Sequence, residues 1–405
     1  MKNRNIFLKN NISKKIFKSR SLNVLSKRFD KKFQEVQEEI KDKNKTLSIL
    51  DKKVRLNFKT KDLNKFKRFK TISIVGMGGS ILGAEALYDF FQEKIKKKVY
   101  FFNDLNETKI TNLKKKEDLS KILFIIISKS GNTLETLSNL FSLRIIKKKS
   151  KNIILITEKK NNLLFSLSKK QNLFYVEHKP YVGGRYSIFS EVGILPAFLM
   201  GININKLRSK ILECLKKKNT KFLKESCIKL VSLINSKKYN NLIFLNYAPR
   251  LEKFLYWCQQ LIAESLGKRG KGFLPMISNS PKDHHSLLQL YLDGPKDKLF
   301  HFFSINQKSK EIINFDKSLK IKSFLNKKKI STVKNAQQMA LIKCFKVKKI
   351  PFRVFKLHKF DEETLGQLFS YFIIETVIVG KMLNINPFDQ PAVEQVKIST
   401  KKLLN

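Results

Sequence analysis

The sequence predicts an α/β protein of two doubly wound units, each a parallel sheet flanked by helices. Three observations indicate this class. The chain has 405 residues, which suits two domains of ordinary size. From Thr71 onward, short β-branched runs alternate with helical stretches, as in βαβ units with buried parallel strands. The alternation pauses near 200–235, where helices dominate, and then resumes, so we expect a second unit of similar build.

Apolar runs of four to eight residues mark the expected strands, since amphipathic helices need longer stretches. In the first unit these runs are TISIVG (71–76), VYFF (99–102), ILFIII (122–127), NIILIT (152–157) and LFYVEH (173–178). In the second unit they are NLIFLNY (241–247), KLFHFFSI (298–305) and RVFKL (353–357). A long helix should run from Asp361 to Leu383, with Asp361 as its cap and two glutamates in the first turn.

The ends of the chain differ from these two units. The first 58 residues are polar and rich in Lys and Asn, and part of them is helix-like. We therefore predict an N-terminal helical arm (1–58), a first, phosphate-binding unit (59–200), a second unit (201–385) and a short C-terminal segment (386–405). No fixed-period repeat is visible.

The charge is strongly basic, with 83 Lys+Arg against 33 Asp+Glu and a net charge of +50. Such a balance is typical of proteins that bind nucleic acid, membrane surfaces or small anions. Here only eleven of the basic residues are Arg, and Lys is abundant together with Asn, Ile and Phe. We interpret this as a compositional bias that spreads Lys over solvated surfaces, and we predict neither a nucleic-acid nor a membrane partner. A nucleic-acid-binding protein would instead show a steep salt dependence.

Cysteine spacing and the N-terminus bear on location and cofactors. The four cysteines form no CxxC pair, and no metal-ligand spacing is present, so we expect reduced thiols, a cytoplasmic location and no metal. The basic start has no apolar stretch of signal-peptide length, although its lack of acids before Asp30 leaves organelle targeting open. No apolar run approaches a membrane span of about 18 residues.

Two turns that follow predicted strands have anion-binding chemistry. The first, GMGGS (76–80), precedes a helix, and its glycines allow close backbone approach. The second, SKSGNT (128–133), places three hydroxyls at a helix start. One hydroxyl there would usually cap the helix, but a cluster beside Gly131 favours an anion site. Both turns should lie at the carboxyl ends of strands, where such sheets bind ligands.

These two turns resemble the sugar-phosphate motif and the companion loop of sugar isomerase (SIS) domains. Four further blocks are similar, in order, to those of the phosphoglucose isomerase family: GGRYS (183–187), WCQQLIAESLGK (257–268), DHHSLLQL (283–290) and NINPFDQPAVEQVK (384–397). The resemblance implies two SIS domains and reversible isomerisation of glucose 6-phosphate and fructose 6-phosphate through a cis-enediolate, in glycolysis and gluconeogenesis. It implies no cofactor, and phosphate contacts from Gly79, Ser80, Ser128, Lys129, Ser130 and Thr133.

Moving a proton between adjacent carbons requires a base, a cation for the developing oxyanion and an acid/base pair to open the sugar ring. Glu264 is the candidate base, because apolar neighbours would desolvate it and raise its pKa. The alternative is a surface pair with Lys268 at i+4. Arg185, after two glycines, is the candidate cation, and its alternative is a structural ion pair.

The acid/base pair comes from two other blocks. When HSLLQLYLDG is aligned with the family block that begins with the ring-opening histidine, His285 rather than the adjacent His284 takes that position. Asp283 could orient one of the two imidazole rings. The family draws this histidine from the neighbouring subunit, which implies a homodimer with shared active sites. Lys397 resembles the family lysine near the ring oxygen, whereas Gln260 and Gln390 resemble glutamines near substrate and phosphate. Ala392 replaces a family glycine, which would cost about 1 kcal/mol if that position needs a positive φ.

Two other functions stay open on the sequence alone. One is an SIS isomerase of wider specificity that also accepts mannose 6-phosphate. The other is a non-catalytic SIS protein that senses a phosphosugar, although such a protein would have no reason to keep Glu264, Arg185, His285 and Lys397 together.

Overall fold

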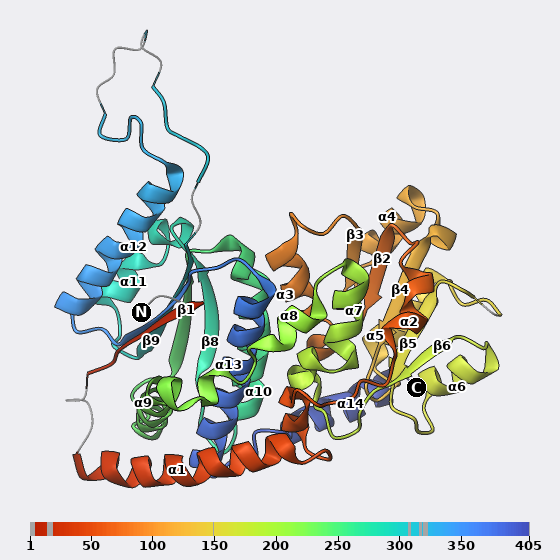
Figure 1. Ribbon diagram of the computed structural model, residues 1–405, viewed down its shortest axis with the longest axis horizontal. Helices are drawn as coiled ribbons and strands as arrows, with labels where there is room; N and C mark the ends of the chain where they lie inside the picture. The colour runs from red at the N-terminus through yellow and green to blue at the C-terminus, as the bar shows by residue number, and fades with distance from the viewer. Residues whose placement is uncertain are drawn as a thin grey trace.

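Two five-stranded sheets stand side by side with a layer of helices between them in the computed structural model (Figure 1). The structure describes residues 5–13, 19–148, 150–306, 309–315, 318 and 323–404. The largest core cluster fills the space between the sheets, and a smaller cluster lies under the outer helices of each sheet. The protein is thus an α/β fold of two similar units, as the sequence predicts.

The first sheet is parallel throughout, in the order β3-β2-β4-β5-β6. All five predicted runs are strands: β2 (Thr71–Val75), β3 (Lys98–Phe102), β4 (Ile122–Ile127), β5 (Ile153–Thr157) and β6 (Phe174–Glu177). The strand order reverses direction between the adjacent strands β2 and β4. Their carboxyl ends therefore form the topological switch point, where open α/β sheets bind ligands.

The second sheet has the order β1-β10-β9-β7-β8. Read from β8, its four parallel strands repeat the order of the first four strands of the other sheet, and β1 takes the fifth position. Three strands were predicted, namely β7 (Asn241–Asn246), β9 (Lys298–Ile305) and β10 (Phe352–Leu357). Two edge strands were not predicted: β1 (Ile6–Asn11), which is antiparallel to β10, and β8 (Leu274–Asn279). Both are partly exposed, and β8 contains Pro275, so neither has the continuous apolar run of a central strand.

The helices between the sheets carry much of the core. They are α3 (Leu82–Phe91), α7 (Glu191–Met200), α8 (Ile204–Ser209), α10 (Glu252–Leu266) and α13 (Glu362–Met382) (Figure 1). α13 begins as predicted, because the Asp361 carboxylate accepts a hydrogen bond from the Thr364 amide at 2.9 Å. Within the described ranges, α13 is the one helix long and apolar enough to cross a membrane, and 89% of its most apolar stretch is buried inside the protein.

The remaining helices cover the outer faces and the ends. α4 (Glu107–Lys116), α5 (Leu134–Leu143) and α6 (Leu163–Lys170) pack on the first sheet, and α11 (Leu288–Asp293) and α12 (Ile330–Val347) pack on the second. The others are α1 (Ser19–Lys41), α2 (Thr60–Leu63), α9 (Lys217–Asn235) and α14 (Glu394–Leu404). The first 58 residues contain the helix that was expected, but β1 places part of them in the second sheet. The four proposed domain boundaries stay predictions.

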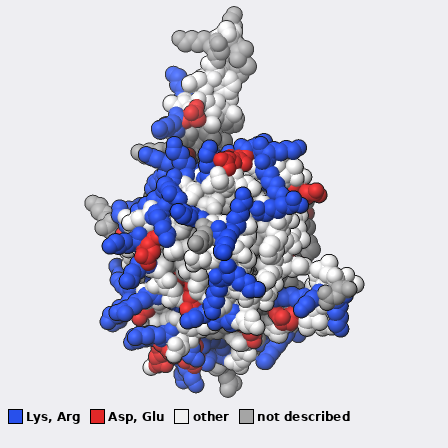
Figure 2. Space-filling view, turned by 90° about the vertical axis from the view of Figure 1, so that its right-hand side faces the viewer, with Lys and Arg blue, Asp and Glu red and all other residues white. Residues whose placement is uncertain are grey.

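Lys and Arg side chains are spread over the face at the right of Figure 1, with uncharged and acidic residues between them (Figure 2). The distribution agrees with the interpretation that the Lys excess is a solvated surface.

Candidate active site

The two anion-binding turns meet at the switch point of the first sheet. β2 and β4 are hydrogen-bonded neighbours, and GMGGS and SKSGNT follow their ends. A Cβ atom built on Gly76 would lie 3.1 Å from the Ile127 carbonyl oxygen, so the two turns begin in direct contact. The sequence prediction that both lie at the same edge of the sheet is confirmed.

The hydroxyls of the SKSGNT turn form a cluster. Ser128 Oγ and Thr133 Oγ1 are 2.8 Å apart, and Ser130 Oγ lies 3.4 Å from Thr133 Oγ1. Thr133 is the N-cap residue of α5, yet its side chain makes no capping hydrogen bond. The alternative that Thr133 merely caps the helix is therefore wrong, and the start of α5 keeps free amides beside three hydroxyls.

Tight packing and a positive φ fix the shape of this turn. Gly131 has φ +69°, and a Cβ atom there would lie 1.8 Å from Asn162 Oδ1, so only glycine fits. The Lys129 ammonium donates to the Pro180 carbonyl at 2.6 Å and lies 3.6 Å from Glu158. Burial lowers the pKa of this ammonium. Because its side chain is engaged in this way, Lys129 can serve the turn through its backbone amide.

Close glycine contacts join the first turn to the GGRYS segment. A Cβ atom on Gly79 would lie 2.1 Å from the Gly184 carbonyl carbon, and Ser187 Oγ donates to the Gly79 carbonyl at 3.2 Å. Gly78 has φ +50° and faces Gln260 on α10. The absence of side chains at these glycines lets three segments converge, and it brings Arg185 and α10 to the edge of the turns.

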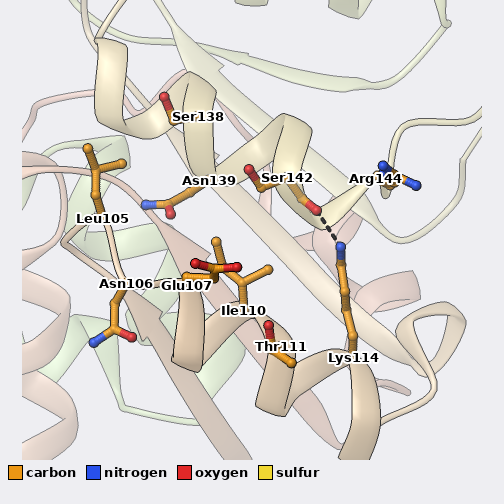
Figure 3. Close-up of a pocket in the computed structure, with 10 residues that line it drawn as sticks. All are labelled: Leu105, Asn106, Glu107, Ile110, Thr111, Lys114, Ser138, Asn139, Ser142 and Arg144. Atoms are coloured by element: carbon orange, nitrogen blue, oxygen red, sulfur yellow. Dashed lines mark hydrogen bonds between the residues drawn. The ribbon is translucent and has the colours of Figure 1, made fainter.

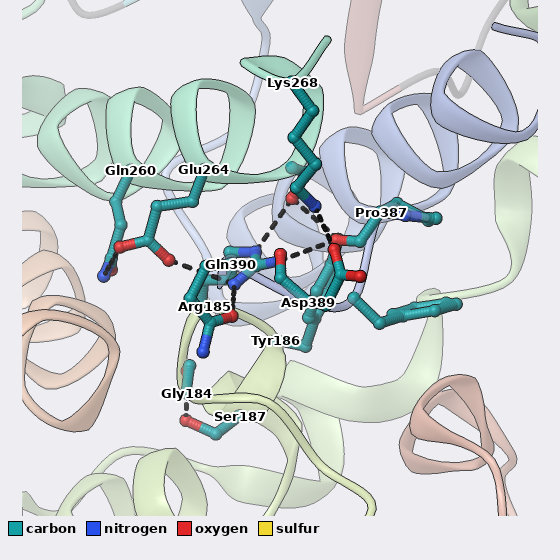
Figure 4. A network of polar contacts seen from close by, with 12 residues as sticks. Gly184, Arg185, Tyr186, Ser187, Gln260, Glu264, Lys268, Pro387, Asp389 and Gln390 are labelled. Atoms are coloured by element: carbon teal, nitrogen blue, oxygen red, sulfur yellow. Dashed lines mark hydrogen bonds and ion pairs between the residues drawn. The ribbon is translucent and has the colours of Figure 1, made fainter. Parts of the chain in front are cut away.

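Arg185 is almost fully buried, at 2% exposure, and every N–H of its guanidinium has an acceptor (Figure 4). The Nη1 atom donates to Glu264 Oε2 at 3.0 Å and to Gln390 Oε1 at 2.8 Å. The Nη2 atom donates to the carbonyls of Pro387 and Asp389, at 2.7 and 3.0 Å. Arg185 therefore ties α10 to the segment 387–390, two of the blocks identified in the sequence.

Glu264 presents a half-open carboxylate beside this cation. Its side chain is 34% exposed, and Oε1 accepts a hydrogen bond from Gln260 Nε2 at 3.0 Å. The expected shielding from solvent is thus only partial. The alternative pairing with Lys268 is wrong, since the Lys268 ammonium binds Asp389 at 2.8 Å. The structure therefore brings Glu264, Arg185, Gln260 and Gln390 into one network.

Sequence reasoning missed two residues that support Arg185. Ser265 Oγ accepts from Arg185 Nε at 2.9 Å and lies 2.8 Å from the Tyr186 hydroxyl. Tyr186 in turn donates to the Pro387 carbonyl at 2.8 Å. Ser265 is fully buried on the apolar side of α10, next to Leu261 and Ile262. A lone hydroxyl on an apolar helix face was the available signal, because such a group needs a buried partner.

The two histidines after β8 have different surroundings. His284 is half-buried, with Nε2 at 2.7 Å from the Tyr247 hydroxyl, and burial lowers its pKa. His285 is exposed, and its ring makes no hydrogen bond to the described residues. Asp283 accepts from the Asn279 amide at 2.7 Å rather than orienting a ring. His285 is not part of the Arg185 network of this chain.

Lys397 also lies outside the network. It is on α14, which is exposed along almost its whole length; the side chain is 64% exposed and pairs with Glu394 at 2.7 Å. Ala392 lies in the 3-10 turn Pro391–Val393 and is not among the residues with positive φ. The strain considered for an alanine at this position is therefore absent.

Cofactor ligands were also considered. In the part of the chain that the structure describes, no group of three or more His, Cys, Asp or Glu side chains could hold a metal ion. Among the buried polar side-chain atoms of this network, Gln260 Oε1 has no hydrogen-bond partner in the described residues.

An α/β fold with a hydroxyl turn at its switch point, beside a buried Arg that pairs with a partly exposed Glu, defines a protein of the SIS class. The family model of phosphoglucose isomerase matches residues 20–405. The chain is 33% identical over 355 residues to a probable glucose-6-phosphate isomerase of Methanococcus maripaludis, covering 83% of this chain and 79% of that protein. It is 34% identical over 350 residues to the glucose-6-phosphate isomerase of Campylobacter jejuni, covering 83% and 86%. The chain belongs to the phosphoglucose isomerase family.

Solved structures share the fold at lower identity. A hypothetical protein from Thermus thermophilus superposes with a TM-score of 0.81 at 24% identity, covering 95% of this chain and 96% of that one. A glucose-6-phosphate isomerase from Chlamydia trachomatis superposes with a TM-score of 0.77 at 17% identity, covering 99% and 88%. At these identities the likeness concerns the fold.

Proposed function

We propose that the chain is an aldose–ketose isomerase that interconverts D-glucose 6-phosphate and D-fructose 6-phosphate, acting in the cytoplasm in glycolysis and gluconeogenesis. The observation that carries the proposal is the Glu264 carboxylate, held 3.0 Å from the buried Arg185 guanidinium. A base and a fixed cation at one point are what enediolate chemistry needs. Family membership supplies the substrate pair.

The phosphate binds at the two turns. The hydroxyls of Ser128, Ser130 and Thr133 and the amides of Gly79, Ser80 and Lys129 offer neutral donors at a helix start, where the dipole favours an anion. Gln260 and Gln390 flank Glu264 and Arg185 and bind substrate oxygens. The phosphate does not react, so these contacts mainly hold the sugar carbons over Glu264.

Isomerisation proceeds on the open-chain sugar. Glu264 removes the proton from C2 of the aldose, the C2 electron pair forms the C1–C2 double bond, and the carbonyl oxygen becomes an oxyanion. Arg185 cannot lose its charge and stabilises that oxyanion. The hydroxyl proton on O2 passes to O1, and Glu264 returns its proton to C1, which leaves a carbonyl at C2 and a hydroxyl at C1 and so yields the ketose. The Nη1 donors face Glu264 and Gln390, so a substrate oxygen can exchange with a side chain there and leave the two backbone contacts of Nη2 intact.

Ring opening is assigned to His285 and Lys397, with His285 supplied by a second copy of the chain. One group takes the anomeric proton and the other protonates the ring oxygen. Two observations support the shared site: His285 is exposed without a hydrogen bond to the described residues, and α14 leaves Lys397 largely uncovered. Both residues are thus available to ligands or to another subunit.

A coupled assay of the purified chain tests the activity. Conversion of fructose 6-phosphate to glucose 6-phosphate should be lost in Glu264→Gln and kept in Glu38→Gln, an exposed carboxylate on α1. Absence of turnover in the wild type, with phosphosugar binding retained, would favour a non-catalytic sensor instead. The same assay with mannose 6-phosphate distinguishes the isomerase of wider specificity.

Mixing two inactive variants tests the shared site. Glu264→Gln and His285→Ala are each inactive alone, but one site of a mixed dimer carries neither change. Random exchange should restore about a quarter of wild-type activity, because about half the dimers are mixed and half of their sites are intact. Mixed dimers confirmed by mass that have no more activity than the parents would contradict the proposal.

A further inference from the structure

A groove of about 460 Å³ lies between α4 and α5 on the outer face of the first sheet (Figure 3). Side chains of both helices face it. α5 also begins at the SKSGNT turn, but the groove is lined by its second half, from Ser138 to Arg144. Ser138 lies about 6 Å, one helical turn, beyond the start of α5, and Arg144 lies about 15 Å beyond it, so the groove extends away from the SKSGNT turn and includes none of its residues.

A buried amide in this groove has an unused acceptor. Asn139 is fully buried, and its Nδ2 donates to the Asp104 carbonyl at 2.9 Å. Its Oδ1 has no hydrogen-bond partner among the described residues. Buried polar atoms are nearly always paired, so an unpaired carbonyl oxygen lining a groove indicates a missing donor. A hydroxyl group of a ligand would supply one.

Two cations lie at one end of the groove. Lys114 Nζ donates to the Ser142 carbonyl at 2.6 Å, which uses one of its three N–H groups (Figure 3). Arg144 follows the end of α5 with φ 55° and lines the same end. Neither cation forms an ion pair with a carboxylate in the described part of the chain. Together they suit a phosphate, whose charge-assisted hydrogen bonds are the strong ones.

The other residues that line the groove indicate the chemistry of the rest of the ligand, apart from its phosphate. Hydroxyls of Thr111, Ser138 and Ser142 and the carboxylate of Glu107 offer hydrogen bonds, and no aromatic side chain is present to stack on a base. Only Leu105 and Ile110 are apolar. We propose that this groove is a second binding site, for a small polyhydroxylated phosphate ester.

Calorimetric titration of the full chain with glucitol 6-phosphate tests the proposal, because this open-chain polyol phosphate cannot isomerise. The wild type should bind two equivalents per chain. Lys114→Glu with Arg144→Glu should weaken one of them by at least about tenfold, the effect of losing one charge-assisted contact. Lys115→Glu with Lys116→Glu changes the net charge of the chain by the same amount but lies outside the groove, and it should leave both sites unchanged.

The two sites are separated by a further variant. Ser128→Ala with Thr133→Ala should remove the other equivalent and keep the Lys114-dependent one. Inorganic phosphate should bind the groove more weakly than the polyol ester, and Asn139→Leu should reduce that difference, since a leucine side chain cannot accept a hydrogen bond from a hydroxyl of the ester. Two results would contradict a binding site in the groove. One is binding of a single equivalent that depends only on Ser128 and Thr133, and the other is equal weakening of binding by the Lys115 and Lys116 control. If the wild type binds one equivalent that depends on Lys114 and Arg144 and not on Ser128 and Thr133, the result counts against the proposed function but supports the groove as a binding site.

Discussion

In the described part of the chain, two buried arginines pair with a glutamate, and the two pairs differ in what surrounds them. Arg353 on β10 and Glu375 on α13 form a two-pronged pair at 2.5 and 3.0 Å, with side-chain exposures of 0% and 3%. Arg185 and Glu264 meet through one contact of 3.0 Å, and Glu264 is 34% exposed. The first pair is thus shielded from solvent, whereas the carboxylate of the second is accessible.

The partners of each pair explain the difference. Arg353 also donates to His301 at 2.9 Å, and Glu375 also accepts from the Tyr371 hydroxyl at 2.7 Å, so that pair belongs to a buried structural network. Arg185 uses its remaining donors to hold backbone carbonyls near Gln390, and it shares one nitrogen between Glu264 and Gln390. The same two residue types therefore serve stability in one place and, we propose, catalysis in the other.

The largest effect is expected at the accessible pair. Glu264→Gln keeps the shape of the side chain and removes its basicity, so turnover should fall by at least about a thousandfold. Unfolding free energy and affinity for a phosphosugar analogue should change little, because the carboxylate is partly solvated. Kinetics and chemical denaturation of the same preparation check both. Turnover within tenfold of wild type would assign the base elsewhere.

The shielded pair should respond in the opposite way. Glu375→Gln leaves Arg353 buried without its counter-charge, and the free energy of unfolding should fall by about 3–5 kcal/mol. Turnover per folded molecule should be unchanged. Arg353→Met with Glu375→Leu should recover most of the stability, since it removes both charges. If the single variant is as stable as the wild type, the pair contributes nothing to folding.

A smaller effect is expected from the support of Arg185. Ser265→Ala removes the acceptor of Arg185 Nε and a partner of the Tyr186 hydroxyl, which should lower kcat by about tenfold, the effect of one unsatisfied buried donor. Ser370→Ala on α13 is the matched control, because Ser370 is equally buried but bonds only to Gln367. Equal kcat in the two variants would mean that Ser265 is merely structural.

The smallest expected effect is a change in the stability of the protein at acidic pH. Burial, with Arg353 beside it, holds the pKa of His301 well below its usual value. Below about pH 6.5, His301 therefore binds a proton in the unfolded chain but stays neutral in the folded chain. The free energy of unfolding should then fall on acidification by up to about 1.4 kcal/mol per pH unit. His301→Gln still accepts from Arg353 and cannot titrate, so the slope should flatten. Some slope will remain from His178, whose pKa burial lowers to about 4. An unchanged slope in His301→Gln would contradict the assignment.

The sequence predicted the central strands and the two turns because buried parallel strands leave a local apolar signature. It missed β1 and β8 because edge strands are half-exposed and need no such run. It also predicted that Glu264 and Arg185 are site residues, but it did not predict that Ser265 and Tyr186 support Arg185. Their roles depend on contacts between segments far apart in the chain, such as Tyr186 with Pro387. The roles of His285 and Lys397 stay predictions, since both lie outside the network of a single chain.

The central claim is that Glu264 moves a carbon-bound proton. Isomerisation of fructose 6-phosphate in D₂O, followed by proton NMR of the glucose 6-phosphate formed, tests it most directly. A single base that exchanges its proton with solvent during the enediolate step should place deuterium at C2. We predict deuterium at C2 with the wild-type chain and none above the uncatalysed background with Glu264→Gln, although the variant still binds the sugar phosphate. Deuterium incorporation by Glu264→Gln at the wild-type rate would contradict the account.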